Sequence, residues 1–365
     1  MIQLRSILTW FETRTRGDLV EKFLINKKVP LRGFSVKHYL GGAILFLFVL
    51  QVLTGILMSL YYVPTVDGAF HSIKMLVTQV EYGWIVRSIH KWAANLMIVI
   101  ACFHLLTVFW SGAYRTPREL TWISGLVLLG SMLAVCFFGY LLPWNDLSYS
   151  ATSIGIEIVR KIPMIGVALV NVLQGGSEFT PRMLSVFFVF HTILLPLFML
   201  GVIVFHVYLI QVHGMHEPRV PESLSKRKGI RNVPFHPYFL KRILVFWVVL
   251  LNAVVLLALL FSPELGEEAN RFAQTPANIK PEWCFLFLYQ TLKIIPPRVL
   301  FVEGEVMVLG MIFIVALYLA AFPFLESADE TSRRNTILRG VVLIIFFIVL
   351  LMGIWGYLSR PLATQ

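Results

Sequence analysis

The chain has 365 residues, of which 58% are hydrophobic and only 14% are charged, whereas soluble proteins have about 25% charged residues. This composition excludes an ordinary soluble domain and indicates an integral membrane protein. The net charge of +11 could serve nucleic-acid binding, but we attribute it to membrane topology and expect no nucleic-acid partner.

The N-terminal segment 1–38 is predicted to be cytoplasmic and amphipathic. Apolar and basic residues alternate from Met1 to Arg16, so this stretch can form one face of an interfacial helix. A solvated leader is the alternative. The stretch has no long apolar h-region and no A-x-A site, which argues against a cleaved signal peptide.

Seven uncharged runs are long enough to cross a hydrocarbon core of about 30 Å, which takes about 20 helical residues. They occupy residues 39–62, 92–113, 120–144, 183–212, 243–263, 306–325 and 340–359. The predicted fold is therefore all-α, an integral membrane bundle of seven transmembrane helices.

An odd number of spans places the two termini on opposite sides of the membrane. The loops on the side of the N-terminus hold 20 Lys or Arg residues, and those on the other side hold 11. Because cytoplasmic loops carry the excess of Lys and Arg, we expect the N-terminus in the cytoplasm. The predicted location is the inner (cytoplasmic) membrane of a prokaryotic cell, as a multi-pass protein.

A polar, basic segment divides the chain into two groups of spans. We expect a four-helix domain at 39–212, a cytoplasmic linker at 213–242 and a three-helix C-terminal domain at 243–365. The outer loops at 145–182 and 264–305 are much longer than the usual connections in helical bundles, which have only a few residues. Loops of this length usually carry function.

Two of the spans each carry a pair of histidines. His90 and His104 are 14 residues apart, and His191 and His206 are 15 apart. Fourteen helical residues return to within about 40° of the starting direction, and fifteen to within about 60°, while advancing about 21 Å. Both spans run inward, so His90 and His191 share the outer leaflet, and His104 and His206 share the inner one.

This arrangement predicts two cofactor sites in the bundle. A neutral imidazole is a standard axial ligand of haem iron, and helical bundles commonly hold cofactors between facing side chains. The first four spans would then form a di-haem bundle. For any single histidine, the alternative is a hydrogen-bonded side chain in the bundle interior.

Glycines on the two flanking spans repeat at the same interval. Gly41 and Gly55 are 14 residues apart on the first span, and Gly125 and Gly139 are 14 apart on the third. Small residues allow close approach of a backbone or of a flat macrocycle. The glycines are therefore predicted to line the two cofactor sites, with ordinary helix packing as the alternative.

These motifs resemble the cytochrome b subunit of the quinol-oxidising bc and bf complexes over nearly the whole chain. The similar segments are RSIHKW (87–92), PRELTW (117–122), GYLLPW (139–144), HTILLP (191–196), LGEEAN (265–270) and PEWC (281–284). The longer histidine interval on the fourth span is similar to the bf type, and the closing spans look like subunit IV fused to it. His236 in PFHPY resembles the bc type.

The resemblance implies a quinol:cytochrome c (or similar acceptor) oxidoreductase with two non-covalent b-type haems. Quinol would be oxidised at the outer face, and electrons would cross to an inner quinone site. Glu282 would be the catalytic proton acceptor. The outer quinol pocket would be formed by Tyr140, Pro143, Pro281, Trp283 and Cys284.

Basic residues would then face the haem propionates. Arg87, three residues before His90, suits the outer haem, although a simple membrane-boundary arginine is the alternative. Arg115 or Arg118 would serve the inner one. The implied partners are a Rieske iron-sulfur protein, a c-type cytochrome or equivalent acceptor, the lipid membrane and a second copy of the complex in a homodimer.

Three positions depart from the family pattern. Cys284 stands where the family has tyrosine, and Thr107 stands where an arginine is frequent. Tyr39 precedes LGG, where bf proteins carry the cysteine that attaches a third haem. We therefore expect no covalent third haem.

Two other functions remain open at this point. A di-haem membrane anchor of a quinone-linked dehydrogenase or hydrogenase also uses transmembrane histidines, but it needs neither the PEW loop nor seven spans. A transporter would use intramembrane histidines and glycines along a substrate path. Transporters usually show paired repeats and charged groups at mid-membrane, and these spans have neither.

Overall fold

The computed structural model describes residues 28–32, 36–175, 182–214, 216, 230–270, 280–327, 329 and 332–359. Residues 1–27 and 33–35 of the predicted amphipathic segment, and residues 215 and 217–229 of the predicted linker, lie outside the described residues.

Within the described residues, seven helical spans are long and apolar enough to cross a membrane, which confirms the predicted fold class. In chain order they are α3 (Leu40–Ser59), α5 (Gly83–Ser111), α6 (Glu119–Leu141), α9–η2–α10 (Arg182–Val189, Phe190–Leu194, Leu195–His213), η3–α12 (Phe235–Phe239, Leu240–Leu260), α14 (Gly304–Leu325) and α15 (Arg333–Leu358). Three spans begin several residues before their predicted starts because the helix continues through charged residues such as Arg87, Lys241 and Arg339.

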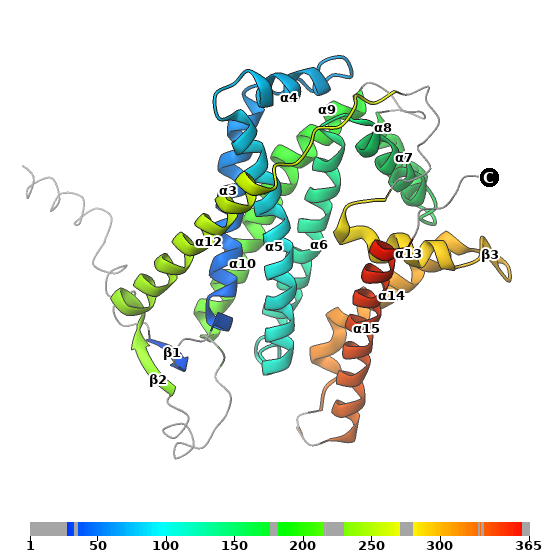
Figure 1. Cartoon of the computed structure of the whole chain (residues 1–365). Helices are drawn as coiled ribbons and strands as arrows, with labels where there is room; N and C mark the ends of the chain where they lie inside the picture. The colour runs from blue at the N-terminus through cyan, green and yellow to red at the C-terminus, as the bar shows by residue number, and fades with distance from the viewer. Residues whose placement is uncertain are drawn as a thin grey trace, which may run out of the picture.

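Short elements precede the first span or connect the spans. They are α4 (Ala69–Thr78), α7 (Asp146–Arg160), α8 (Gly166–Gln174), α13 (Leu286–Ile294), the turns η1 (Val36–His38) and η4 (Trp283–Phe285), and the strands β1 (Lys28–Arg32), β2 (Ile230–Pro234), β3 (Arg298–Val299) and β4 (Val302–Glu303). The strands pair antiparallel, β1 with β2 and β3 with β4. Figure 1 shows α4, α7 and α8 at one end of the bundle and the β1–β2 pair at the other.

The α7 helix starts where a local sequence signal places it. The side chain of Asn145 accepts a hydrogen bond from the backbone N–H of Ser148, whose hydroxyl in turn accepts from the Asn145 backbone N–H. This capping box satisfies two donors that a helix start leaves open. Pro163 lies between α7 and α8, and Gly166 begins α8, so the long outer loop contains two short helices.

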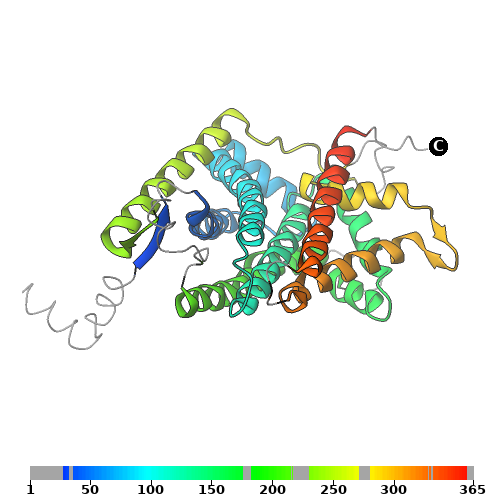
Figure 2. The same cartoon turned by 90° about the horizontal axis from the view of Figure 1, so that it is seen from below.

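The first four spans form the middle of the molecule. The α3 helix packs along α5, and α6 packs along α10. The α12 helix lies beside α5 and α3, whereas α14 contacts α6, and α15 contacts α13. Figures 1 and 2 show α12 and α15 on opposite sides of the four-helix group. The division into a four-helix and a three-helix domain stays a prediction.

Candidate functional site

The four intramembrane histidines form two neighbouring pairs. The ring centres of His90 and His191 are 6.1 Å apart, with the ring planes at 67°. At the other level of the bundle, His104 and His206 lie close enough to interact electrostatically. The structure therefore brings together the same pairs that the helical spacing predicted.

Each of the four predicted glycines faces one of these imidazoles. A Cβ added at Gly41 would lie 3.6 Å from the ring of His104, and one at Gly55 would lie 3.5 Å from His90. On α6, Gly125 faces His206 at 3.5 Å, and Gly139 is in still closer contact with His191. The glycines thus keep open the space beside each imidazole.

A π-helical turn explains the unequal histidine spacing. His191 lies in η2, a short π-helix inside the fourth span. A π-bulge adds one residue to an α-helix, and the α-helix then continues. The segment from His191 to His206 therefore covers the same arc as the segment from His90 to His104 on the regular α5, although it is one residue longer.

Two hydroxyl side chains fix how the rings present their nitrogens. The Thr54 hydroxyl lies 2.8 Å from Nδ1 of His90 and donates its hydrogen to the Leu50 carbonyl. The Ser124 hydroxyl lies 2.8 Å from Nδ1 of His206 and donates to a carbonyl one turn back. Because each hydroxyl hydrogen is already engaged, the oxygen accepts from an Nδ1–H, which leaves Nε2 with a lone pair for a metal.

The second histidine of each pair differs in its partner. Nδ1 of His191 donates to the carbonyl of Val135 at 2.9 Å, so its Nε2 is also left with a lone pair. Nδ1 of His104 is buried and has no hydrogen-bond partner in the described part of the chain.

This arrangement fits a metal held between imidazoles. Two imidazoles that share one metal at a bond length of about 2 Å have ring centres about 6.4 Å apart. The observed 6.1 Å between His90 and His191 is close to that value. Flanking glycines also leave room for a flat macrocycle around the metal. The residues present therefore fit haem iron with two histidine ligands.

The PEWC segment lies against the same helix that carries His90. Nζ of Lys91 lies 3.1 Å from Oε1 of Glu282, and the Trp283 indole donates to Oδ1 of Asn95 at 2.9 Å. Both partners are on α5, one and five positions after His90. The carboxylate of Glu282 is therefore held against the part of α5 that carries His90, with 28% of its side chain exposed.

Two other predicted pocket residues, Tyr140 and Cys284, lie near Glu282. Tyr140, at the end of α6, lies close enough to the Glu282 carboxylate to interact with it electrostatically. Cys136, which was not among the predicted residues, does the same. Cys284 packs with Cys136 against the central core, and burial raises the pKa of the Cys284 thiol. Pro143 is half-buried just after α6, and Pro281 is half-buried beside Glu282.

Hydrogen bonds between segments far apart in the sequence hold the end of the bundle near Glu282 together. The LGEEAN segment binds the corner between α6 and α7, where Ala269 donates to the Trp144 carbonyl and Asp146 donates to the Glu267 carbonyl. The Asn145 side chain donates to the carbonyl of Leu265. These bonds hold the outer loop over the end of the four-helix group.

The three predicted arginines have different partners. Arg87 donates to the carbonyls of Pro263 and Glu264, so it anchors the loop that follows α12. Arg115 forms an ion pair with Glu326, and Arg118 donates to the carbonyl of His213 at the end of α10. A role for any of them beside a haem propionate stays a prediction.

Sequence reasoning missed the residues that support the histidines. Thr54 and Ser124 each directly precede a predicted glycine, so the Thr-Gly and Ser-Gly pairs were a usable signal. Lys91 directly follows His90 and was also visible as a charge at the start of a span. By contrast, the Trp283–Asn95 bond joins residues 188 apart, which no local pattern predicts.

Comparison with known proteins decides the family. Residues 25–214 match the family model described as Cytochrome b/b6/petB, and residues 268–362 match the one described as Cytochrome b(C-terminal)/b6/petD. The chain belongs to the cytochrome b family. Its b6-like part and its subunit IV-like part are joined in one polypeptide, as the sequence predicted.

Similar proteins extend this result to the whole length. The cytochrome b subunit of a cytochrome bc complex from Chlorobaculum thiosulfatiphilum is 34% identical over 94% of this chain and 79% of that protein. Cytochrome b6 of Heliobacterium mobile is 40% identical over 58% of this chain and its own full length. A hyperthermophilic respiratory Complex III chain superposes with a TM-score of 0.80 at 26% identity, covering 97% of this chain and 92% of that one.

The protein is therefore a cytochrome b subunit of a bc- or bf-type complex, an oxidoreductase, with seven membrane-spanning helices. Membership of the family implies that it binds haem b.

Proposed function

We propose that this cytochrome b oxidises quinol at the outer face of the membrane and delivers electrons to a second quinone site at the inner face. The observation that carries this proposal is the two-level arrangement of paired imidazoles, with the Glu282 loop next to one level. A chain built in this way offers an electron path through the bundle and a proton acceptor at one end of it.

His90 and His191 would hold the outer haem, and His104 and His206 the inner one. When bound, the two haems supply one-electron transfer along the bundle. Thr54, Ser124 and the Val135 carbonyl orient the rings, so that three of the four Nε2 atoms face the site with their lone pairs free.

Glu282 would take a proton from quinol and release it toward the outer water phase. It is partly exposed and held by Lys91, so it can exchange protons with solvent, while proline and tryptophan neighbours fix its backbone. The pocket would be completed by Tyr140, Pro143, Pro281, Trp283 and Cys284. Since its raised pKa keeps the Cys284 thiol protonated, the thiol can act only as a weak hydrogen-bond donor.

The proposal also includes the orientation of the chain in the membrane and the proteins with which it works. The excess of Lys and Arg in the loops on the N-terminal side favours a cytoplasmic N-terminus in a prokaryotic inner membrane. Quinol oxidation at the outer face would need a Rieske iron-sulfur protein and a c-type cytochrome or similar acceptor. We expect the complex to be a homodimer.

Steady-state quinol oxidation by the purified complex tests the role of Glu282. Glu282→Gln keeps the side-chain shape and removes the proton acceptor, so turnover should fall by roughly 10²- to 10⁴-fold while the haem spectrum is unchanged. Glu267→Gln is the matched control, because its side chain is exposed on the same outer loop. Equal rates and equal pH profiles in both variants would show that the proton leaves by another route.

A further inference from the structure

A cavity of about 390 Å³ opens between α5 and α15 at the end of the bundle remote from Glu282. Its lining includes Phe109, Trp110, Tyr114, Arg115, Arg339 and Leu343. The C-terminal ends of α5 and α14 meet the N-terminal ends of α6 and α15 here, on the side of the chain's N-terminus. None of these residues belongs to the histidine pairs or to the outer pocket.

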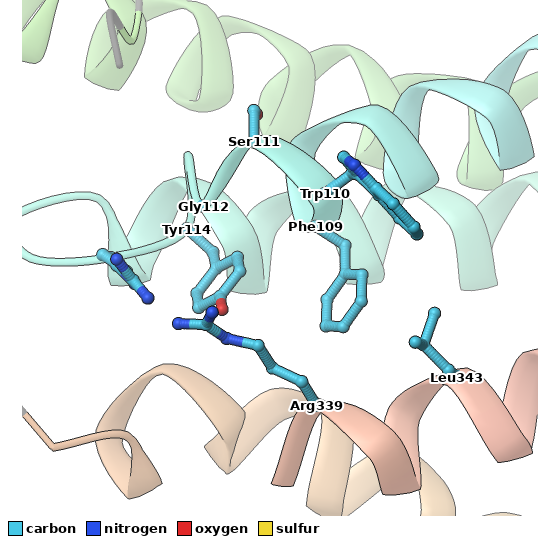
Figure 3. Close-up of a pocket in the computed structure, with 8 residues that line it drawn as sticks. Phe109, Trp110, Ser111, Gly112, Tyr114, Arg339 and Leu343 are labelled. Carbon is cyan, nitrogen blue, oxygen red and sulfur yellow. The ribbon is translucent and has the colours of Figure 1, made fainter. Parts of the chain in front are cut away.

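The cavity has a charged end and an apolar end. In Figure 3, Arg339 extends from α15 toward the Tyr114 hydroxyl, while Phe109, Trp110 and Leu343 lie on the other side. Trp110 is 80% exposed and stands on the outer surface of a membrane span. Tryptophan at this level of a membrane protein usually sits at the boundary of headgroups and acyl chains.

One carboxylate links the two arginines. Glu326, whose side chain is only 4% exposed, accepts from Nε of Arg115 at 2.9 Å and from Nε of Arg339 at 2.6 Å. Two guanidinium groups and one carboxylate leave one positive charge in excess. A single monoanionic group would neutralise this cluster.

A donor for such a group is already in place. Nη2 of Arg339 is buried and has no hydrogen-bond partner within the described ranges. The Tyr114 hydroxyl is buried beside Glu326 and Arg115. Burial, and then the Glu326 carboxylate with which it also hydrogen-bonds, raise the pKa of this phenol, so it stays protonated.

We propose that this cavity binds an anionic phospholipid of the leaflet on the N-terminal side, with its phosphodiester near Arg339 and Tyr114 and its first acyl carbons along Phe109, Trp110 and Leu343. A free phosphate ion would leave the apolar end unused, and a neutral lipid would leave the excess charge. Basic pockets between transmembrane helices are a known way to bind anionic headgroups.

Native mass spectrometry of the haem-containing protein in a nonionic detergent tests the proposal. Phosphatidylglycerol and phosphatidylcholine are titrated separately, with and without inorganic phosphate. We expect one tightly held phosphatidylglycerol per chain, weaker binding of phosphatidylcholine, and no displacement by phosphate. Arg339→Leu should weaken phosphatidylglycerol binding about tenfold or more, as expected for a lost charge-assisted hydrogen bond.

Two further variants keep the test decisive. Arg334→Leu removes an exposed arginine of the same helix outside the cavity and should bind lipid like the wild type. Leu343→Trp fills the apolar end without touching the Glu326 ion pairs, so it should weaken binding even if Arg339→Leu fails to assemble. Equal binding of both lipids, displacement by phosphate, or unchanged affinity in Leu343→Trp would overturn the proposal.

Discussion

Replacing the glycine beside one imidazole with a bulky residue should remove one haem and leave the other. Gly125 on α6 faces His206, and a Cβ there would lie 3.5 Å from Cε1 of the ring. A leucine side chain would extend further into the space beside His206, which a macrocycle bound to that ring must occupy. Gly125→Leu should therefore reduce the haem content from two per chain to one.

The expected changes in stability distinguish a glycine that lines a haem site from one that serves only helix packing. If Gly125 served packing alone, Gly125→Ala would be tolerated, since 3.5 Å is a normal contact, and it would gain about 0.8–1 kcal/mol in helix propensity. A cofactor present at about 1,000 times its dissociation constant contributes about 4 kcal/mol to stability. Loss of the haem in Gly125→Leu therefore outweighs any gain in propensity, and the thermal midpoint should fall.

The assay combines haem per polypeptide, from the pyridine haemochrome, with a reduced-minus-oxidised spectrum and a melting curve. Gly130→Leu is the matched control, because Gly130 is exposed on the same helix and a Cβ there would have nothing within 4 Å. It should keep both haems. Two haems in Gly125→Leu would refute the idea that this glycine lines a haem site.

Three further predictions concern the surroundings of the haem sites. Ser124→Ala removes the hydroxyl that lies 2.8 Å from Nδ1 of His206 and should weaken haem affinity at that level by about 10- to 100-fold in a haem-competition assay, while the other level stays unchanged. Deletion of Leu194 should convert the π-turn into α-helix and keep two haems, whereas deletion of Ile100 from the regular α5 should rotate the two halves of that helix by about 100° and lose one. Tyr39 cannot form a thioether, so haem staining after denaturing electrophoresis should leave this polypeptide blank, and a stained band would contradict the expectation.

Much of the fold could be predicted because membrane spans obey a simple rule. Each span must be long and apolar, so seven uncharged runs correspond to seven helices. The starts of some spans were missed, since basic residues such as Arg87 lie inside the helix near its end, where a long side chain can reach polar partners. Length and hydropathy therefore find a span better than they find its boundary.

The histidine pairs and the glycines beside them could also be predicted, because both follow from the helical repeat. The π-turn at His191 could not, since the interval between His191 and His206 is equally compatible with a regular helix whose two imidazoles point in somewhat different directions. The Lys91–Glu282 ion pair joins α5 to a loop nearly two hundred positions later. Contacts of this kind depend on how distant segments pack, and a single sequence does not contain that information.

Double variants of the histidines test the two-haem arrangement most directly. Replacing both members of one proposed pair, His104 and His206, with alanine should leave one haem per chain, because the other pair is intact. Replacing one member of each pair, His90 and His206, should leave none, although the number of lost ligands is the same. Haem per polypeptide, measured by the pyridine haemochrome, should therefore be one in the first variant and zero in the second. Equal haem content in the two variants, or more haem in the second, would contradict the proposed pairing.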